Sequence, residues 1–171
     1  MKRFALLLIC FCCVLSGFSQ DTSRVEFIIR NIGIGVDGHF NAVQIETKLN
    51  AEGDLQSIQG AIEVASIETG IDSRDEHLLK ADYFDVLNHA TITLVSNAVI
   101  ETSEGVFKVD GVLTIKGKSK DISITVQRKK ENNQYTITSS FQINRRDYHV
   151  GGRSIAMSNT VKINVVHYHS L

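Results

Sequence analysis

The chain has 171 residues, of which 43% are hydrophobic and 22% charged, and its formal net charge is −1 at pH 7. This is the composition of an ordinary globular protein, and the length is typical of a single domain. The chain lacks the basic excess of nucleic-acid-binding proteins and the long like-charged blocks of disordered tails. We therefore expect one folded domain and no nucleic acid partner.

The first residues have the pattern of a secretory signal peptide. Lys2 and Arg3 precede an apolar run at residues 4–15, and small residues stand just before a cleavage site at Gln20. The run is too short to cross a bilayer. We predict a signal at residues 1–19 and a mature periplasmic or secreted chain at residues 20–171, without a transmembrane segment. All the cysteines lie in the predicted signal, so we expect no disulfide and no cysteine nucleophile in the mature chain.

After the signal, the dominant sequence period is two. Alternation of apolar and polar residues, the pattern of strands with one wet face, is clear in five segments: 24–30, 107–116, 122–127, 134–143 and 161–167. It is weaker at 43–49, 58–67 and 91–100. These segments predict an all-β domain of about eight antiparallel strands, either a closed barrel or a two-sheet sandwich.

One stretch near the middle of the chain breaks this alternation. Ser73 and Glu76 have the spacing of a helix capping box, and Asp82 is placed to cap a second short turn. We expect a short helical insert at this point.

The glycines favour the barrel over the sandwich. Gly33, Gly35 and Gly38 crowd the region after the first strand, and Gly60 and Gly111 lie in mid-strand, where glycine permits a bulge, a bend or a close approach. We expect residues 33–38 and the helical insert to interrupt the ladder, and therefore to be where a ligand enters.

Apolar residues on the inferred inward faces are the candidate ligand-binding residues. In a small barrel the inward side chains either fill the interior or enclose one ligand. The alternation of apolar and polar residues does not decide between these two possibilities. An enclosed ligand would be an apolar chain, because the inward set has few polar members. The candidates are Phe27, Ile29, Phe40, Ile62, Leu94, Phe107, Leu113, Ile124, Ile137 and Phe141.

Catalytic and metal-binding patterns are weak in this sequence. Arg74, Asp75 and His77 lie together on the insert as an acid/base candidate, although attachment of the insert to the barrel is the favoured role for them. His167 and His169 share one strand face without further ligands at a usable spacing, so a fraying strand is preferred to a metal site. Arg145, Arg146 and Asp147 predict a structural ion pair at a strand end. We predict no enzyme activity, no metal and no cofactor.

Four segments of the sequence resemble the YceI-like family. They are FIIRNIGIGVDGHF at 27–40, SIETGIDSRDEHLLKADYFD at 66–85, VDGVLTIKGKSK at 109–120 and FQINRRDYHV at 141–150. The most specific motif is R-D-x-H-L followed by D-x-F-D, which is matched by Arg74, Asp75, His77, Leu78, Asp82, Phe84 and Asp85. A second motif, L-T-I-x-G-x-x-K, is matched by Leu113, Thr114, Ile115, Gly117 and Lys120.

This resemblance implies a lipocalin-like antiparallel barrel in the cell envelope that binds a polyisoprenoid, or a related lipid such as an isoprenoid quinone. We expect the insert to cover one end of the barrel, with Leu78, Leu79, Tyr83 and Phe84 facing either the lipid or the core beneath it. The alternative is a barrel with a filled core that acts as a structural or protein-binding envelope stress factor without a lipid. A homodimer is also left open.

Overall fold

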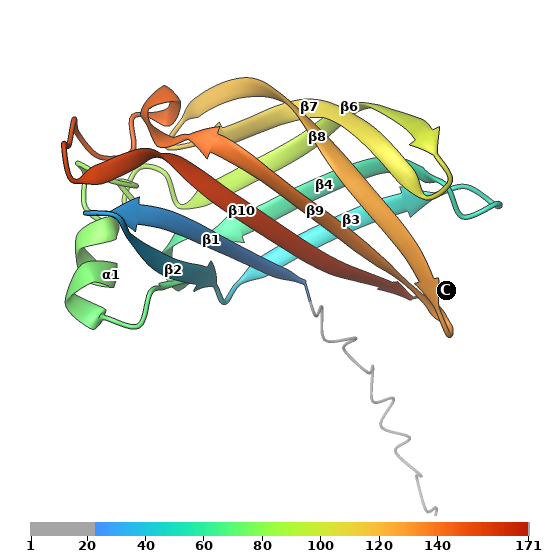
Figure 1. Cartoon of the computed structure of the whole chain (residues 1–171), viewed down its shortest axis with the longest axis horizontal. Coiled ribbons are helices and arrows are strands. Elements are labelled where there is room, and N and C mark those ends of the chain that lie inside the picture. Colours follow the sequence, from blue (N-terminus) through green and yellow to red (C-terminus); the bar gives the residue numbers. More distant parts are fainter. Residues whose placement is uncertain (1–22, 171) are drawn as a thin grey trace, which may run out of the picture.

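The computed structural model describes residues 23–170, so the predicted signal peptide lies outside the described residues. Ten strands form one antiparallel sheet (Figure 1). They are β1 (Arg24–Asn31), β2 (Ile34–Phe40), β3 (Val43–Leu49), β4 (Leu55–Glu63), β5 (Ile67–Glu68), β6 (Thr91–Ser103), β7 (Val106–Ile115), β8 (Lys118–Glu131), β9 (Gln134–Asn144) and β10 (Met157–Ser170). The helical elements are α1 (Asp72–Leu78), η1 (Val64–Ser66) and η2 (Arg145–Tyr148). None of the helices within residues 23–170 has the length and the apolar character of a membrane-spanning segment.

The sheet curls on itself without closing its hydrogen-bonded ladder. The strand order is β3-β4-β6-β7-β8-β9-β10-β1-β2-β5, which leaves β3 and β5 at the edges. Side chains connect β3 to β10 across the open seam, where Thr47 Oγ1 lies 2.8 Å from His169 Nδ1. The predicted barrel-like all-β fold with a short helical insert is therefore confirmed, with ten strands.

The two ends of the curled sheet differ in what covers them (Figure 1). One end, here called the lid end, carries α1, the turns that follow it, the β1–β2 turn and the β9–β10 connection. The other, here called the turn end, carries the short β3–β4, β6–β7 and β8–β9 turns and the C-terminal part of β10. Residues 72–90, from α1 to the start of β6, are called the lid.

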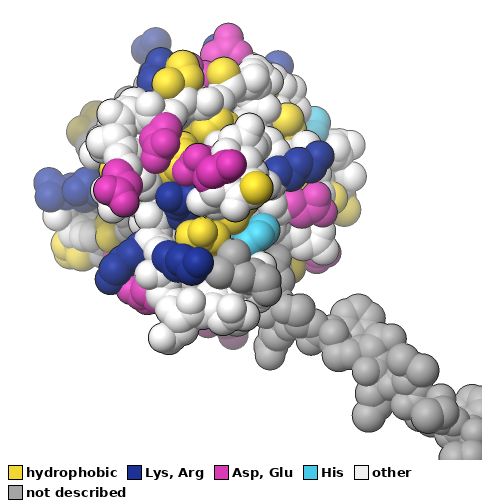
Figure 2. Space-filling model, turned by 90° about the vertical axis from the view of Figure 1, so that its right-hand side faces the viewer, with side chains coloured by type: hydrophobic (Ala, Val, Ile, Leu, Met, Phe, Trp, Pro, Cys, Tyr) yellow, Lys and Arg dark blue, Asp and Glu magenta, His cyan; other side chains and the backbone are white. Residues whose placement is uncertain are grey.

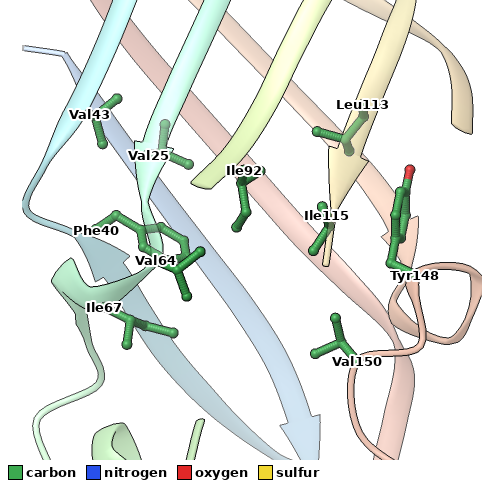
Figure 3. Packing of buried hydrophobic residues seen from close by; sticks show 10 residues of the cluster. All are labelled: Val25, Phe40, Val43, Val64, Ile67, Ile92, Leu113, Ile115, Tyr148 and Val150. Atoms are coloured by element: carbon green, nitrogen blue, oxygen red, sulfur yellow. The ribbon is translucent and has the colours of Figure 1, made fainter. Parts of the chain in front are cut away.

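Each end has its own cluster of buried apolar side chains. At the lid end the cluster includes Phe40, Ile92, Leu113 and Tyr148, which reach inward from different elements (Figure 3). At the turn end the cluster consists of Leu55, Ile58, Phe107, Val109, Ile124, Val126, Tyr135 and Ile137.

Two predictions about the first half of the chain were wrong. Residues 33–38 were expected to interrupt the ladder, but only Gly33 lies outside it: residues 34–38 belong to β2, which pairs with β1 from Ile34 opposite Asn31 to Phe40 opposite Val25. The segment 58–67 is not one strand, because η1 separates β4 from β5. Glycine lowers strand propensity locally, but pairing to a neighbouring strand overrides that preference.

Gly38 and Gly111 have the roles expected of strand glycines. A Cβ on Gly38 would clash with the Phe27 ring, so the missing side chain makes room for an aromatic residue of β1. A Cβ on Gly111 would lie 2.5 Å from the Val95 carbonyl oxygen, where the β6–β7 register shifts between Ser96 and Ala98. The close approach predicted for mid-strand glycine is thus found at Gly111, whereas a Cβ on Gly60 would meet only ordinary contacts at 3.9–4.0 Å.

The predicted capping box at Ser73 does not form. The residue before α1 is Ile71, and it makes no side-chain cap. Asp75 instead turns out of the first helical turn and accepts hydrogen bonds from the backbone N–H and hydroxyl of Thr69. The helix begins two residues earlier than the box requires because this contact to the end of β5 orients its first turn.

Candidate functional site: an apolar cavity inside the curled sheet

The curled sheet encloses a cavity of 320 Å³. All ten strands contribute side chains to its wall, and most of those side chains are aliphatic or aromatic. This volume falls at the lower end of the range for ligand pockets, which are concave and mainly apolar. Of the ten predicted inward residues, nine line the cavity: Phe27, Ile29, Phe40, Ile62, Leu94, Leu113, Ile124, Ile137 and Phe141.

Phe107 is the exception. It is 1% exposed and belongs to the turn-end cluster, outside the cavity wall. Its predicted role in ligand contact is therefore corrected to core packing. The strand alternation placed its side chain inward correctly, but there the ring packs within the turn-end cluster instead of bordering free space.

The partial burial of the wall shows that the interior is hollow. Phe27, Leu94 and Phe141 lie on paired strands and face inward, yet each keeps accessible surface. Phe107, which also faces inward, is 1% exposed because other side chains pack directly against it. Natural cores are normally filled to high density. The cavity therefore disfavours the alternative of a filled barrel.

At the turn end the interior is sealed by packing and by one arginine. The Arg128 guanidinium donates to the Gly53 carbonyl and pairs with the Asp54 carboxylate at 3.1 Å. The same group lies over the rings of Phe107 and Tyr135, 5.5 and 5.1 Å from their centroids. It thus ties the β3–β4 turn to the underlying core. Figure 2 shows this end from outside, with charged side chains of both signs distributed over it.

At the lid end the cavity is covered by the helical insert. Leu78, Tyr83 and Phe84 line the cavity, whereas Leu79 packs against the adjacent core cluster without lining it. The Phe84 ring meets the Phe40 ring edge-on, with centroids 6.5 Å apart. Part of the insert thus faces the cavity and part faces the core beneath it.

A few hydrogen bonds hold the lid to the sheet. Lys116 Nζ in the β7–β8 turn donates to the Ala81 carbonyl at 2.7 Å and to the His149 carbonyl at 3.1 Å. The Gly151 N–H donates to the Asp82 carbonyl at 2.9 Å. None of the lid residues belongs to the buried class. A cover with few buried side chains and partly exposed hydrogen bonds opens at lower cost than a packed core.

The acid/base candidates on the insert do not converge on one point. Arg74 donates to the hydroxyl and carbonyl of Thr69, and Asp75 accepts from the same residue, so both attach α1 to the end of β5. His77 turns elsewhere, with its Nε2 3.5 Å from the Asp82 carboxylate and its ring against Tyr83. Because these three side chains bond to different partners, they do not form the arrangement of a nucleophile with a general acid and a general base.

Arg145 does not form the predicted ion pair. It is 3% exposed and donates to the carbonyls of Val150, Gly152 and Ser158 at 2.8, 3.1 and 2.9 Å, and to the Asn159 side-chain oxygen at 3.3 Å. Asp147 is exposed. Burial, and next the neighbouring Arg146, lower the pKa of Arg145. The guanidinium carries five N–H donors in a rigid planar group, so it can bond several carbonyl oxygens at once. Arg145 therefore orders the β9–β10 connection.

His167 and His169 lie at the seam on a strand that is paired with β9 through Ser170, so the expected fraying was wrong. His167 is buried and lines the cavity, and its Nδ1 is 2.8 Å from Ser23 Oγ. Thr47 Oγ1 contacts both histidines. Among residues 23–170, no three His, Cys, Asp or Glu side chains are grouped to hold a metal ion.

Several wall residues were missed at the sequence level. Val36 was not predicted because β2 was not recognised, and Tyr148 and Val150 come from η2 and the loop behind it. The alternating pattern could have indicated Ile163 and Val165 on β10, since that strand was predicted. The loop residues had no periodic signal at all.

Comparison with known proteins agrees with this architecture. The sequence profile of the YceI-like domain matches residues 18–167. A UPF0312 protein of Staphylococcus epidermidis is 30% identical over 115 residues, which cover 64% of this chain and 63% of that protein. A UPF0312 protein of Ectopseudomonas mendocina is 31% identical over 77 residues, covering 45% of this chain and 40% of that protein. The matches thus span between two fifths and two thirds of these relatives.

Solved structures share the fold at low sequence identity. BcnA of Burkholderia cenocepacia superposes with a TM-score of 0.81 at 23% identity, over 86% of this chain and 96% of that one. A polyisoprenoid binding domain from Saccharophagus degradans, implicated in plant cell wall breakdown, superposes with a TM-score of 0.63 at 16% identity, over 87% and 94% of the two chains. With the domain profile covering nearly all of the described residues, this chain belongs to the YceI-like family.

Proposed function

We propose that the chain binds an isoprenoid or another long apolar lipid, such as an isoprenoid quinone, in the cavity and carries or sequesters it in the cell envelope. The observation that carries this proposal is the 320 Å³ cavity with an apolar wall built from every strand. The name of the Saccharophagus degradans domain supports a polyisoprenoid as the ligand class. The arrangement of Arg74, Asp75 and His77 supports binding without turnover.

The energy available from such a wall is sufficient. Removing about 400 Å² of apolar surface from water at about 25 cal/mol per Å² contributes roughly 10 kcal/mol before ordering costs are subtracted. A flexible chain loses conformational freedom on entry, so the net affinity is smaller. An apolar wall with few polar anchors selects for chain shape more than for a particular head group.

The location is part of the same proposal. The cationic start, the apolar run at 4–15 and the small residues before Gln20 support secretion, with function in the periplasm or outside the cell. Mass measurement of the protein isolated from envelope and cytoplasmic fractions tests this. An envelope species that begins at Gln20 is expected, and an intact chain confined to the cytoplasm would contradict it.

Native mass spectrometry tests lipid binding most directly. Protein purified without detergent should carry a bound lipid that is released by organic extraction, or should take up an isoprenoid quinone when empty. A protein that is consistently empty and also fails to take up quinone refutes the proposal.

Two neighbouring positions on β6 provide a matched pair of variants. Leu94 lines the cavity, whereas Val95 is exposed on the outer face. Leu94→Trp should fill the cavity and abolish quinone uptake, whereas Val95→Trp should leave uptake unchanged. Circular dichroism of both variants separates a filled cavity from an unfolded chain. If Leu94→Trp fails to fold, Ile124→Phe is the milder filling variant.

We propose that the lipid enters at the lid end. The turn end is sealed by Phe107 and its neighbours, whereas exposed residues such as Asn31 and His77 line the cavity at the lid end. Hydrogen exchange with and without quinone tests this, with protection expected across residues 73–85 and 33–38. Protection confined to the turn end would place the entrance there.

A further inference from the structure

Three isoleucines stand exposed beside one another at the lid end. Ile32 is 76% exposed, Ile34 71% and Ile155 fully exposed. The β1–β2 turn and the β9–β10 connection that carry them are joined by a hydrogen bond of 2.8 Å from the Ile32 N–H to the Ala156 carbonyl. These three residues are called the apolar rim. Large apolar side chains grouped in solvent indicate an interaction surface more often than isolated ones do.

The backbone at Ile32 argues that this side chain does not serve the fold. Its φ is 51°, in the left-handed region that β-branched residues avoid. In the β8–β9 turn a similar conformation, with a φ of 54°, is adopted by Asn132, a residue type that tolerates it. Ile32 therefore costs stability in the turn and contributes little packing, because most of its surface is in water.

The two segments that carry the apolar rim are positively charged. Arg30 and Arg153 are exposed, and neither forms an ion pair within residues 23–170. The two segments that carry the rim, 30–35 and 149–158, contain no Asp or Glu. Apolar side chains flanked by such arginines complement an anionic lipid surface, in which apolar groups enter the interface and cations meet the head groups.

The position of the rim fits a bilayer better than a second copy of this chain. Asn31, directly before Ile32, and Met157, two residues after Ile155, line the cavity. A bilayer against this end would therefore lie next to the cavity margin. A symmetric contact between two rims would instead bring Arg30 and Arg153 of each copy against like charges.

We infer that the apolar rim docks the protein onto an anionic membrane surface, with the cavity margin facing the bilayer. The purpose of this docking, transfer of lipid without passage through water, rests on the proposed function. The docking itself does not, so it is tested with vesicles that contain no isoprenoid.

The experiment is co-flotation of the mature chain with vesicles of phosphatidylcholine alone or mixed with phosphatidylglycerol. Binding to the anionic vesicles should be stronger and should weaken with added salt, because exposed charges are screened beyond about 10 Å at 0.1 M. Ile32→Asn should lower this binding about tenfold by removing an apolar side chain that enters the interface. It should leave the midpoint of urea unfolding unchanged or raised, because asparagine suits the turn.

Two further variants complete the test. Arg153→Gln should lower binding to anionic vesicles about fivefold and leave phosphatidylcholine binding unaffected. Ile100→Asn is the matched control, since Ile100 is 55% exposed on β6 and lies outside the rim, and it should bind like the parent protein.

Failure of the parent protein to bind anionic vesicles overturns the inference, and a protein partner for the rim would give this result. Equal loss of binding in Ile32→Asn and Ile100→Asn overturns it as well. Vesicle binding without quinone uptake would refute the proposed function and leave the docking surface standing. Quinone uptake without vesicle binding would support the proposed function and overturn the docking inference.

Discussion

At each end of the curled sheet an arginine donates hydrogen bonds to loop oxygens, yet the two ends differ in how they are covered. At the turn end, Arg128 covers Phe107 and Tyr135 and ties down a short turn over a filled core. At the lid end, Arg145 orders a long connection beside a cavity, and the lid above it has no fully buried residue. Both ends contain a buried apolar cluster, so the difference lies in their covers: a short turn tied down by Arg128 at the turn end, and a lid without buried residues at the lid end.

The largest expected effect separates two phenylalanines that face the interior. Phe107→Ala should lower the free energy of unfolding by about 4 kcal/mol, because it leaves a void in the packed turn end. Phe141→Ala should cost only about 1–2 kcal/mol, because that ring already borders free space, but should weaken quinone binding about tenfold. Urea unfolding and quinone titration measure both.

If both phenylalanine variants lost the same stability, the distinction between a fully packed core residue and a cavity-wall residue would be wrong. Phe107→Leu serves where the alanine variant does not fold, and it should cost less stability than Phe107→Ala while leaving quinone binding intact.

The second prediction compares the two arginines. Arg145→Met should destabilise the protein by about 3 kcal/mol, because it removes a buried charge-assisted network and leaves the Val150 and Ser158 carbonyls without that donor. Arg128→Met should cost about 1–2 kcal/mol, since the methionine still packs over Phe107. Thermal unfolding of both variants measures which substitution costs more stability. A larger loss for Arg128→Met than for Arg145→Met would contradict this prediction.

The third prediction concerns how firmly the lid is held. Lys116→Met removes the donor to the Ala81 and His149 carbonyls, and should speed amide exchange in residues 72–90 about fivefold, equivalent to about 1 kcal/mol. Bound quinone should also exchange faster. Lys108→Met is the control, because the exposed Lys108–Asp110 pair on β7 is worth little. Unchanged exchange in the lid would show that Lys116 does not hold it.

The smallest effect is a pH dependence from Tyr148. Burial, and next the carboxylate of Asp147, raise the pKa of this 2% exposed tyrosine. The tyrosine of the unfolded chain ionises at a pH of about 10, before the tyrosine of the folded protein does. The folded state therefore loses stability as the pH rises through about 10, and the loss grows until the folded pKa is reached. Stability should therefore fall in alkaline solution, and Tyr148→Phe should flatten the fall. An identical alkaline profile in the two proteins would assign the loss to other groups.

The amino-acid sequence alone determined most of the strands and their inward faces, although β2 was not recognised. Alternation has a period of two in any strand, whatever surrounds it, so the positions of Phe27, Leu94 and Phe141 along the chain were enough to place them inside. The helical insert was also recognisable, because it breaks that period. The contact that orients the first turn of α1 could not be recognised, since Asp75 accepts a hydrogen bond from Thr69 only after β5 and α1 are brought together.

Tertiary structure decided where the interior is hollow. Phe107 and Phe141 follow the same alternation, and only the side chains that surround each ring in the folded sheet make one a core residue and the other a cavity residue. The partners of Arg145 were equally inaccessible, because they are carbonyls of an irregular connection with no periodic signal. Local pattern determines which way a side chain points, whereas the curvature of the whole sheet determines what that side chain meets.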